Sequence, residues 1–176
     1  GYTLKLGGQD RRMNTKKEFI DDIAMTLGGY VTEQMLFDDL STGPSNDLQV
    51  VANIARDMVT KYGMSDKLGP NSLEGTGGRM LGGGYSEDRG YSPQVAKMID
   101  DEVALIISEG MAKAKDALTT HIDALHAISK RLAEVETLER EEYEALLKQH
   151  GVMIKDAFRE KYGHFSDVGD PSSVVA

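Results

Sequence analysis

Residues 41–63 read STGPSNDLQVVANIARDMVTKYG, and the start of this stretch is the most informative place in the chain. It opens with a cluster of turn and cap residues of the kind that precedes a helix. Apolar side chains then recur every three or four residues until Gly63, at positions 48, 51, 54, 55, 58 and 59. This spacing predicts an amphipathic helix with one buried face.

A second predicted helix precedes this stretch. Thr15 and Glu18 form a capping-box pattern, in which each side chain accepts a hydrogen bond from the backbone N–H of the other residue. The apolar residues that follow keep a helical period as far as Leu27. Gly28-Gly29 then either ends this helix or allows another backbone to come close, before a helical run resumes over residues 31–37.

More helices are predicted in the second half of the chain. Ser92-Pro93 supplies an N-cap and a first-turn proline for a long helix whose apolar stripe includes Ile106. A helix from about His121 follows, and we expect it to pack antiparallel to the long helix because the connection is short. Thr137 is predicted to cap a shorter helix that stops at Gly151.

The fold class is therefore mainly α, a helical bundle with one short N-terminal strand and a long Gly-rich loop. The strand is predicted from the alternation over residues 2–6, and the loop from the glycines between residues 68 and 91. We expect one helical domain over residues 1–163 and a disordered tail over residues 164–176. A lone strand needs partners, so we expect the chain to be part of a longer protein.

Composition excludes several classes of function. The 176 residues carry 20 basic and 29 acidic side chains, a net charge of −9, which opposes binding to nucleic acid. The absence of cysteine excludes disulfides and thiolate metal sites. No apolar run approaches the roughly 18 residues of a membrane span, so the chain as given is expected to be soluble.

Asp47 is the candidate site residue, and two roles are open for it. A carboxylate in the first turn of a helix is commonly a capping acid, stabilised by free N–H groups and by the helix dipole. However, Asp47 is in line with Val51, Ile54 and Met58, so its side chain is expected to lie on the buried stripe. A buried carboxylate needs a partner, and a metal is one of the possible partners.

Other polar residues give weaker signals. His121 and His126 are five residues apart, which places them on different sides of a helix, and His150 and His164 are interpreted as exposed or capping residues. No H-E-x-x-H motif occurs. The glycines of residues 75–84 lack the lysine of a phosphate-binding loop. The acidic run over residues 99–102 is interpreted as a solvated helix face.

Four blocks of this sequence resemble, in their usual order, the peptidase domain of FtsH-type ATP-dependent zinc proteases. The most specific block covers residues 41–70, where a serine-threonine-glycine turn, an asparagine-aspartate pair and a tyrosine-glycine-methionine-serine turn occur together. The other blocks are LGGYVTEQMLF at 27–37, YSPQVAKMIDDEV at 91–103 and AKDALTTHIDALHAISKRLAEVETLE at 114–139.

This resemblance implies a zinc protease as the parent protein. In the family, an H-E-x-x-H helix supplies two zinc ligands and a general base, and the aspartate that matches Asp47 supplies the third ligand. Family members are membrane-anchored homo-hexamers that degrade protein substrates, with the peptidase ring facing the cytoplasm or an organelle interior. ATP and Mg²⁺ bind to an ATPase module.

The H-E-x-x-H helix and the ATPase module of the family are not in this sequence. With one carboxylate in place of three protein ligands, we expect that this chain alone does not bind zinc and is inactive. The alternative is a non-catalytic helical module that forms a ring or binds partners and has lost its active site. If Asp47 is only a cap, another acid such as Glu33 would have to be the third ligand.

Overall fold

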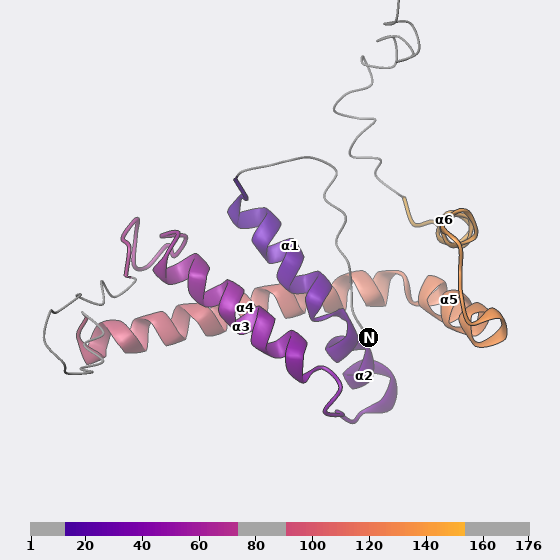
Figure 1. Ribbon diagram of the computed structural model, residues 1–176, viewed down its shortest axis with the longest axis horizontal. Coiled ribbons are helices and arrows are strands. Elements are labelled where there is room, and N and C mark those ends of the chain that lie inside the picture. The colour runs from indigo at the N-terminus through magenta and orange to yellow at the C-terminus, as the bar shows by residue number, and fades with distance from the viewer. Residues whose placement is uncertain (1–12, 74–90, 154–176) are drawn as a thin grey trace, which may run out of the picture. The chain divides into compact units, whose positions relative to one another are not determined.

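The computed structural model describes residues 13–73 and 91–153, and every regular element within these ranges is an α-helix. The predicted mainly α class is confirmed. The strand expected at residues 2–6, the tail at 164–176 and the loop glycines of 74–90 lie outside the described residues. The helices shown in Figure 1 are α1 (Lys16–Thr26), α2 (Gly28–Phe37), α3 (Ser45–Thr60), α4 (Pro93–Thr120), α5 (Ile122–Val135) and α6 (Arg140–Gln149).

The chain divides into two compact units, and each is described by itself. One unit is Met13–Thr120, which contains α1 to α4, and the other contains α5 and α6. In the first unit α4 packs against α1, α2 and α3, while α1 also contacts α2 and α3. Figure 1 shows α1 and α3 lying across the long α4. The antiparallel pairing expected between α4 and α5 concerns helices of different units and stays a prediction.

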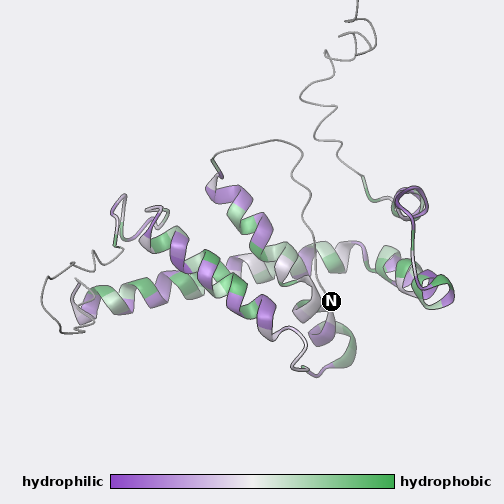
Figure 2. Ribbon diagram, viewed as in Figure 1, coloured by the Kyte–Doolittle hydropathy of each residue, from purple (hydrophilic) through white to green (hydrophobic). Residues whose placement is uncertain are grey.

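The core of the first unit is formed by the apolar stripes that the sequence predicts. Apolar and polar residues alternate along α3 and α4 in Figure 2, as expected for amphipathic helices. The stripe of α4 is buried against α1, α2 and α3. The buried cluster comprises Ile20, Ile23, Leu27, Val31, Val51, Ala55, Met58, Val59, Ile99, Ile106 and Ala114.

Local capping fixes where α1 and α4 begin. The Thr15 N–H donates to Glu18 Oε2 at 2.8 Å, and the Glu18 N–H donates to Thr15 Oγ1 at 3.3 Å. At the start of α4, the Val95 N–H donates to Ser92 Oγ at 3.3 Å. These hydrogen bonds confirm both predicted caps. The caps could be predicted because they depend only on residues a few positions apart.

The close helix contact occurs at a glycine other than the predicted pair. Gly28 and Gly29 are the first two residues of α2, and a Cβ added at either would meet no atom within 4 Å. The close-approach alternative is therefore wrong for both. Gly110 of α4 is buried, and a Cβ added there would lie 3.1 Å from Ile23 Cβ and closer still to Ile23 Cγ2. Gly110 thus lets α1 and α4 approach each other.

Replacing Gly110 with alanine is expected to destabilise the fold by about 1 to 2 kcal/mol. Overpacking typically costs about 1 to 3 kcal/mol, and the severe contact with Ile23 Cγ2 puts this site at about 2 to 3 kcal/mol, of which the better helix propensity of alanine offsets about 1 kcal/mol. Urea unfolding followed by circular dichroism measures the change. Gly29→Ala is the matched control, since Gly29 is exposed in α2 and should tolerate the methyl group. Equal stability of Gly110→Ala and wild type would show that the two helices are not in close contact.

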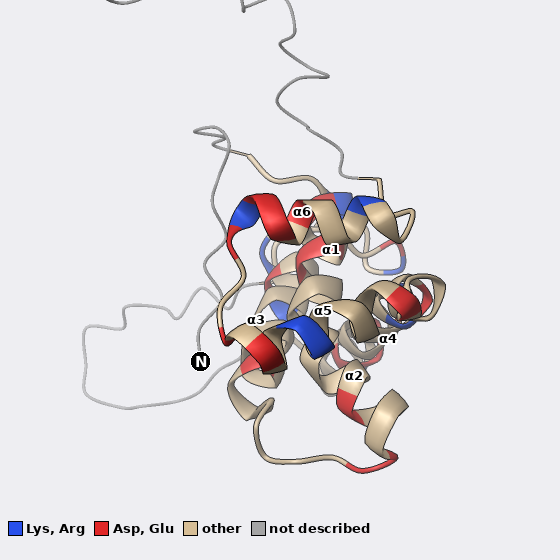
Figure 3. Cartoon of the chain, turned by 90° about the vertical axis from the view of Figure 1, so that its right-hand side faces the viewer, with Lys and Arg blue, Asp and Glu red and all other residues tan. Residues whose placement is uncertain are grey.

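In the second unit, α5 and α6 pack against each other and are linked by charge. Arg131 Nε donates to Glu142 Oε1 at 2.6 Å, and this bond raises the pKa of Arg131 above its ordinary value. Within α6, Arg140 Nε donates to Glu144 Oε1 at 2.7 Å and lowers the pKa of that carboxyl group. Figure 3 shows acidic and basic residues together on α6.

The start of α6 corrects one prediction. Its N-cap is Glu139, not Thr137, and no side chain caps the helix. The Thr137 N–H instead donates to the Val135 carbonyl oxygen at 2.7 Å, in the turn that follows α5. The turn therefore delays the helix by two residues.

Among the described residues no helix combines the length and the apolar character needed to cross a membrane.

Candidate functional site

Asp47 is the third residue of α3, and its side chain is exposed. The predicted stripe does lead inward from it, because Val51 and Met58 are buried. However, the prediction that Asp47 itself is buried is wrong. All residues from Ser45 to Val50 are exposed, including Leu48 at 41%, so the start of α3 extends beyond the edge of the core.

The structure shows that Asp47 does not cap α3 through a hydrogen bond. The N-cap of α3 is Pro44, and no side chain makes a capping hydrogen bond there. The carboxylate of Asp47 lies in the first turn, so it can stabilise α3 through the helix dipole, a contribution of about 0.3 to 1 kcal/mol. This leaves the carboxylate oxygens available to a ligand.

The turn before α3 is tied to α2 by Glu33. The backbone N–H of Ser41 donates to Glu33 Oε2 at 3.0 Å, and the Ser41 hydroxyl lies 3.0 Å from each oxygen of the same carboxylate. The Gly43 N–H donates to Ser41 Oγ at 3.1 Å. Glu33 is therefore engaged with the turn, whereas Asp47 has no hydrogen bond or ion pair with another described residue.

The donor chemistry of Asp47 fits one ligand of a zinc ion. A carboxylate oxygen is an ordinary zinc ligand, and no existing contact with a described residue has to be broken to use it. The remaining ligands are not provided here, since residues 13–73 and 91–153 hold no cluster of three or more side chains that could bind a metal. This part of the chain can contribute one ligand to a zinc site and does not form a whole site.

Comparison with known proteins gives the family of the chain. Residues 1–146 match the sequence model of peptidase family M41. The chain belongs to this family. The matched range contains α2 with Glu33, the turn with Ser41, and α3 with Asp47.

Relatives of this M41 chain are named ATP-dependent zinc metalloprotease FtsH. The M41 chain is 41% identical over 162 residues to the ATP-dependent zinc metalloprotease FtsH of Bacillus subtilis, and the match covers 91% of the chain and 25% of that protein. With the ATP-dependent zinc metalloprotease FtsH 1 of Sphaerobacter thermophilus, the identity is 42% over 85% of the chain and 23% of the relative. The M41 chain thus spans about a quarter of the length of these relatives.

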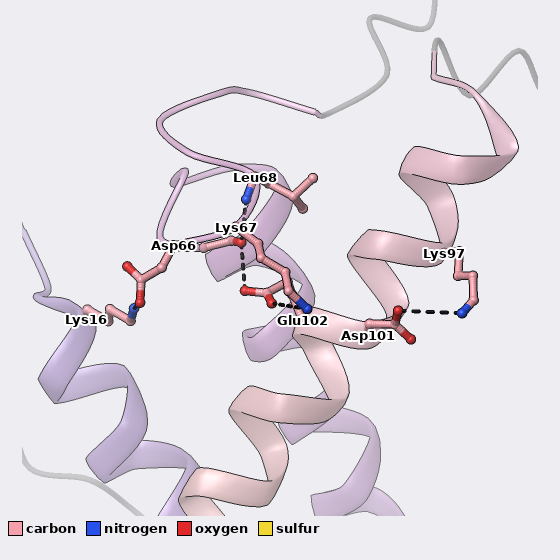
Figure 4. Close-up of polar contacts among 8 residues, drawn as sticks. Lys16, Asp66, Lys67, Leu68, Lys97, Asp101 and Glu102 are labelled. Carbon is pink, nitrogen blue, oxygen red and sulfur yellow. Dashed lines mark hydrogen bonds and ion pairs between the residues drawn. The ribbon is translucent and has the colours of Figure 1, made fainter.

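A buried acid of the M41 chain contradicts the sequence interpretation. Glu102 was expected on a solvated face of α4, but it is only 5% exposed. Ser65, also buried, donates its hydroxyl to Glu102 Oε2 at 2.8 Å, and Lys67 Nζ lies 3.8 Å from Glu102 Oε1 (Figure 4). The Leu68 N–H donates to Ser65 Oγ at 3.0 Å. Glu102 therefore anchors the turn that follows α3 onto α4.

The sequence contained a signal for Glu102. It lies three residues after Ile99 and four before Ile106, both of which are buried, so it shares their face of α4. The hydrogen bond from Ser65 and the ion pair with Lys67 give the buried carboxylate the partners that it requires. We assign Glu102 a structural role, because its partners come from one turn and it lies in a network with no unpaired buried side chain among the described residues.

Three of the four histidines of the M41 chain are described. His121 is the N-cap of α5, His126 is exposed on α5, and His150 is the C-cap of α6. The capping prediction for His150 is confirmed. His164 lies outside the described residues.

Proposed function

We propose that this chain is part of the peptidase region of a longer ATP-dependent zinc metalloprotease. The match of residues 1–146 to peptidase family M41 carries the proposal, and the names of the relatives supply the activity. Residues 1–163 would form the helical part of the peptidase domain. The parent would unfold and degrade protein substrates, using ATP and Mg²⁺ in a separate module.

In this proposal Asp47 contributes one carboxylate to the metal site. When bound, zinc would activate a water molecule and polarise the scissile carbonyl group. The support from the structure is the exposed carboxylate of Asp47, which has no hydrogen-bond or ion-pair partner within residues 13–73 and 91–153 and lies at the start of a well-anchored helix. We further propose that the parent is a membrane-anchored homo-hexamer whose peptidase ring faces the cytoplasm or an organelle interior.

The test compares the full-length protein with the 176-residue chain. We expect the full-length protein to degrade casein in the presence of ATP, to lose this activity when a chelator removes zinc, and to regain it when zinc is restored. The chain alone should not cleave casein, because the described residues provide no complete metal site.

Two outcomes would contradict the proposal. A purified full-length protein that neither holds zinc nor cleaves casein would favour the alternative, a non-catalytic helical module that forms a ring or binds partners. Zinc-dependent cleavage by the 176-residue chain, surviving stringent purification, would show that its own side chains complete the site.

A further inference from the structure

The start of α3 is held in place by a chain of hydrogen bonds that begins at Glu33. The Glu33 carboxylate accepts the Ser41 N–H and the Ser41 hydroxyl, and the Ser41 oxygen in turn accepts the Gly43 N–H. A carboxylate that accepts two donors from one residue fixes both the position and the orientation of that residue. The turn is therefore bound to α2 at a defined place.

The same chain of contacts continues into α3. The Ser45 N–H donates to the Thr42 carbonyl oxygen at 3.2 Å, and the Leu48 N–H donates to the Pro44 carbonyl oxygen at 3.0 Å. Pro44 is buried although its neighbours on both sides are exposed. Overlapping hydrogen bonds thus span residues 41–48, from the turn held by Glu33 to the first turn of α3, where Asp47 lies.

The turn also closes tightly over the carboxylate. A Cβ added at Gly43 would lie 3.1 Å from Ser41 Oγ and 3.6 Å from Glu33 Oε1. A bulkier residue at position 43 would therefore crowd the Ser41 hydroxyl and come into van der Waals contact with Glu33. This packing leaves little freedom for the turn to shift while the Glu33–Ser41 contact is intact.

We propose that Glu33 is a positioning residue for Asp47: it holds the Ser41–Pro44 turn, and the turn directs the Asp47 carboxylate toward the metal. This inference rests on the proposed function. In this role Glu33 acts through Ser41, because both of its carboxylate oxygens accept hydrogen bonds from that residue. A helix start that extends beyond the core has few packing contacts, so hydrogen bonds must fix its direction.

The experiment measures the zinc dissociation constant of the full-length protein by competition with a chromophoric chelator. Glu33→Gln and Ser41→Ala are each expected to weaken zinc binding about 10-fold, the lower end of the range for groups that orient metal ligands. Ser41→Thr keeps the hydroxyl group and should restore affinity close to that of the wild type. The double variant should be no weaker than the weaker single variant, because both changes break one path.

Two controls separate positioning from loss of the fold. Glu109→Gln removes an exposed acid of α4 that has no partner among the described residues, and it should leave the dissociation constant unchanged. The urea unfolding midpoint of each zinc-free variant reports on the fold. A purely structural role would lower this midpoint without changing the affinity of the folded protein for zinc.

Each contrary outcome has a different meaning. If Glu33→Gln abolishes zinc binding while Ser41→Ala leaves it intact, Glu33 is a ligand and the positioning role is overturned. If neither variant weakens binding, the turn does not direct Asp47, and the inference fails while the proposed function stands. A wild-type full-length protein that holds no zinc overturns the proposed function itself.

Discussion

Asp47→Asn in the full-length protein is expected to reduce zinc content and casein degradation sharply while the fold and ATP hydrolysis persist. An amide oxygen carries no charge and binds zinc far less well than a carboxylate, so we expect a loss of at least about 100-fold in zinc affinity. The fold should lose no more than about 1 kcal/mol, because Asp47 stabilises α3 only through the helix dipole.

Zinc content by atomic absorption, casein degradation and ATP hydrolysis measure the three quantities. Asp116→Asn is the matched control, since Asp116 is an exposed acid of α4 without a partner among the described residues. It should keep all three quantities at the wild-type level. Full zinc occupancy and normal proteolysis in Asp47→Asn would leave Asp47 as a helix-dipole residue only.

Ile106→Ala is expected to destabilise the unit formed by α1 to α4 by about 2 to 5 kcal/mol. Ile106 is 4% exposed and packs in the cluster that joins α4 to the other three helices, so the substitution leaves a cavity. The neighbouring Leu105 is 60% exposed, and Leu105→Ala should change the free energy of unfolding by no more than about 0.5 kcal/mol. Urea unfolding of both variants tests the comparison.

A loss below about 0.5 kcal/mol for Ile106→Ala would mean that α4 packs through a different face. Equal losses at positions 105 and 106 would show that the helix is covered on both sides. Either result would contradict the packing of α4 against α1, α2 and α3 through the face that carries Ile106.

The helices could be predicted from the sequence because their signals are local. The Thr15–Glu18 capping box, the Ser92 cap and the stripe of α3 depend on residues within one or two turns of each other. The helical spacing of Glu102 from Ile99 and Ile106 also indicated that Glu102 is buried, although the charge of the residue led to the opposite interpretation.

Features that depend on contacts between helices could not be predicted in this way. The close approach of α1 and α4 occurs at Gly110, whereas Gly28 and Gly29 were the conspicuous glycines. The exposure of Asp47 depends on how far α3 extends beyond its neighbours, which no periodicity specifies. The hydrogen bond from the Ser41 N–H to the Glu33 carboxylate links a turn to a neighbouring helix, so no pattern of spacing in the sequence indicates it.

The assignment of Asp47 as a zinc ligand is tested most directly by anomalous diffraction at the zinc edge from crystals of the full-length protein. We expect an anomalous peak about 2.0 to 2.2 Å from a carboxylate oxygen of Asp47, with Glu33 still hydrogen-bonded to Ser41. A zinc peak coordinated by Glu33, or by other residues with Asp47 outside ligand distance, would contradict it.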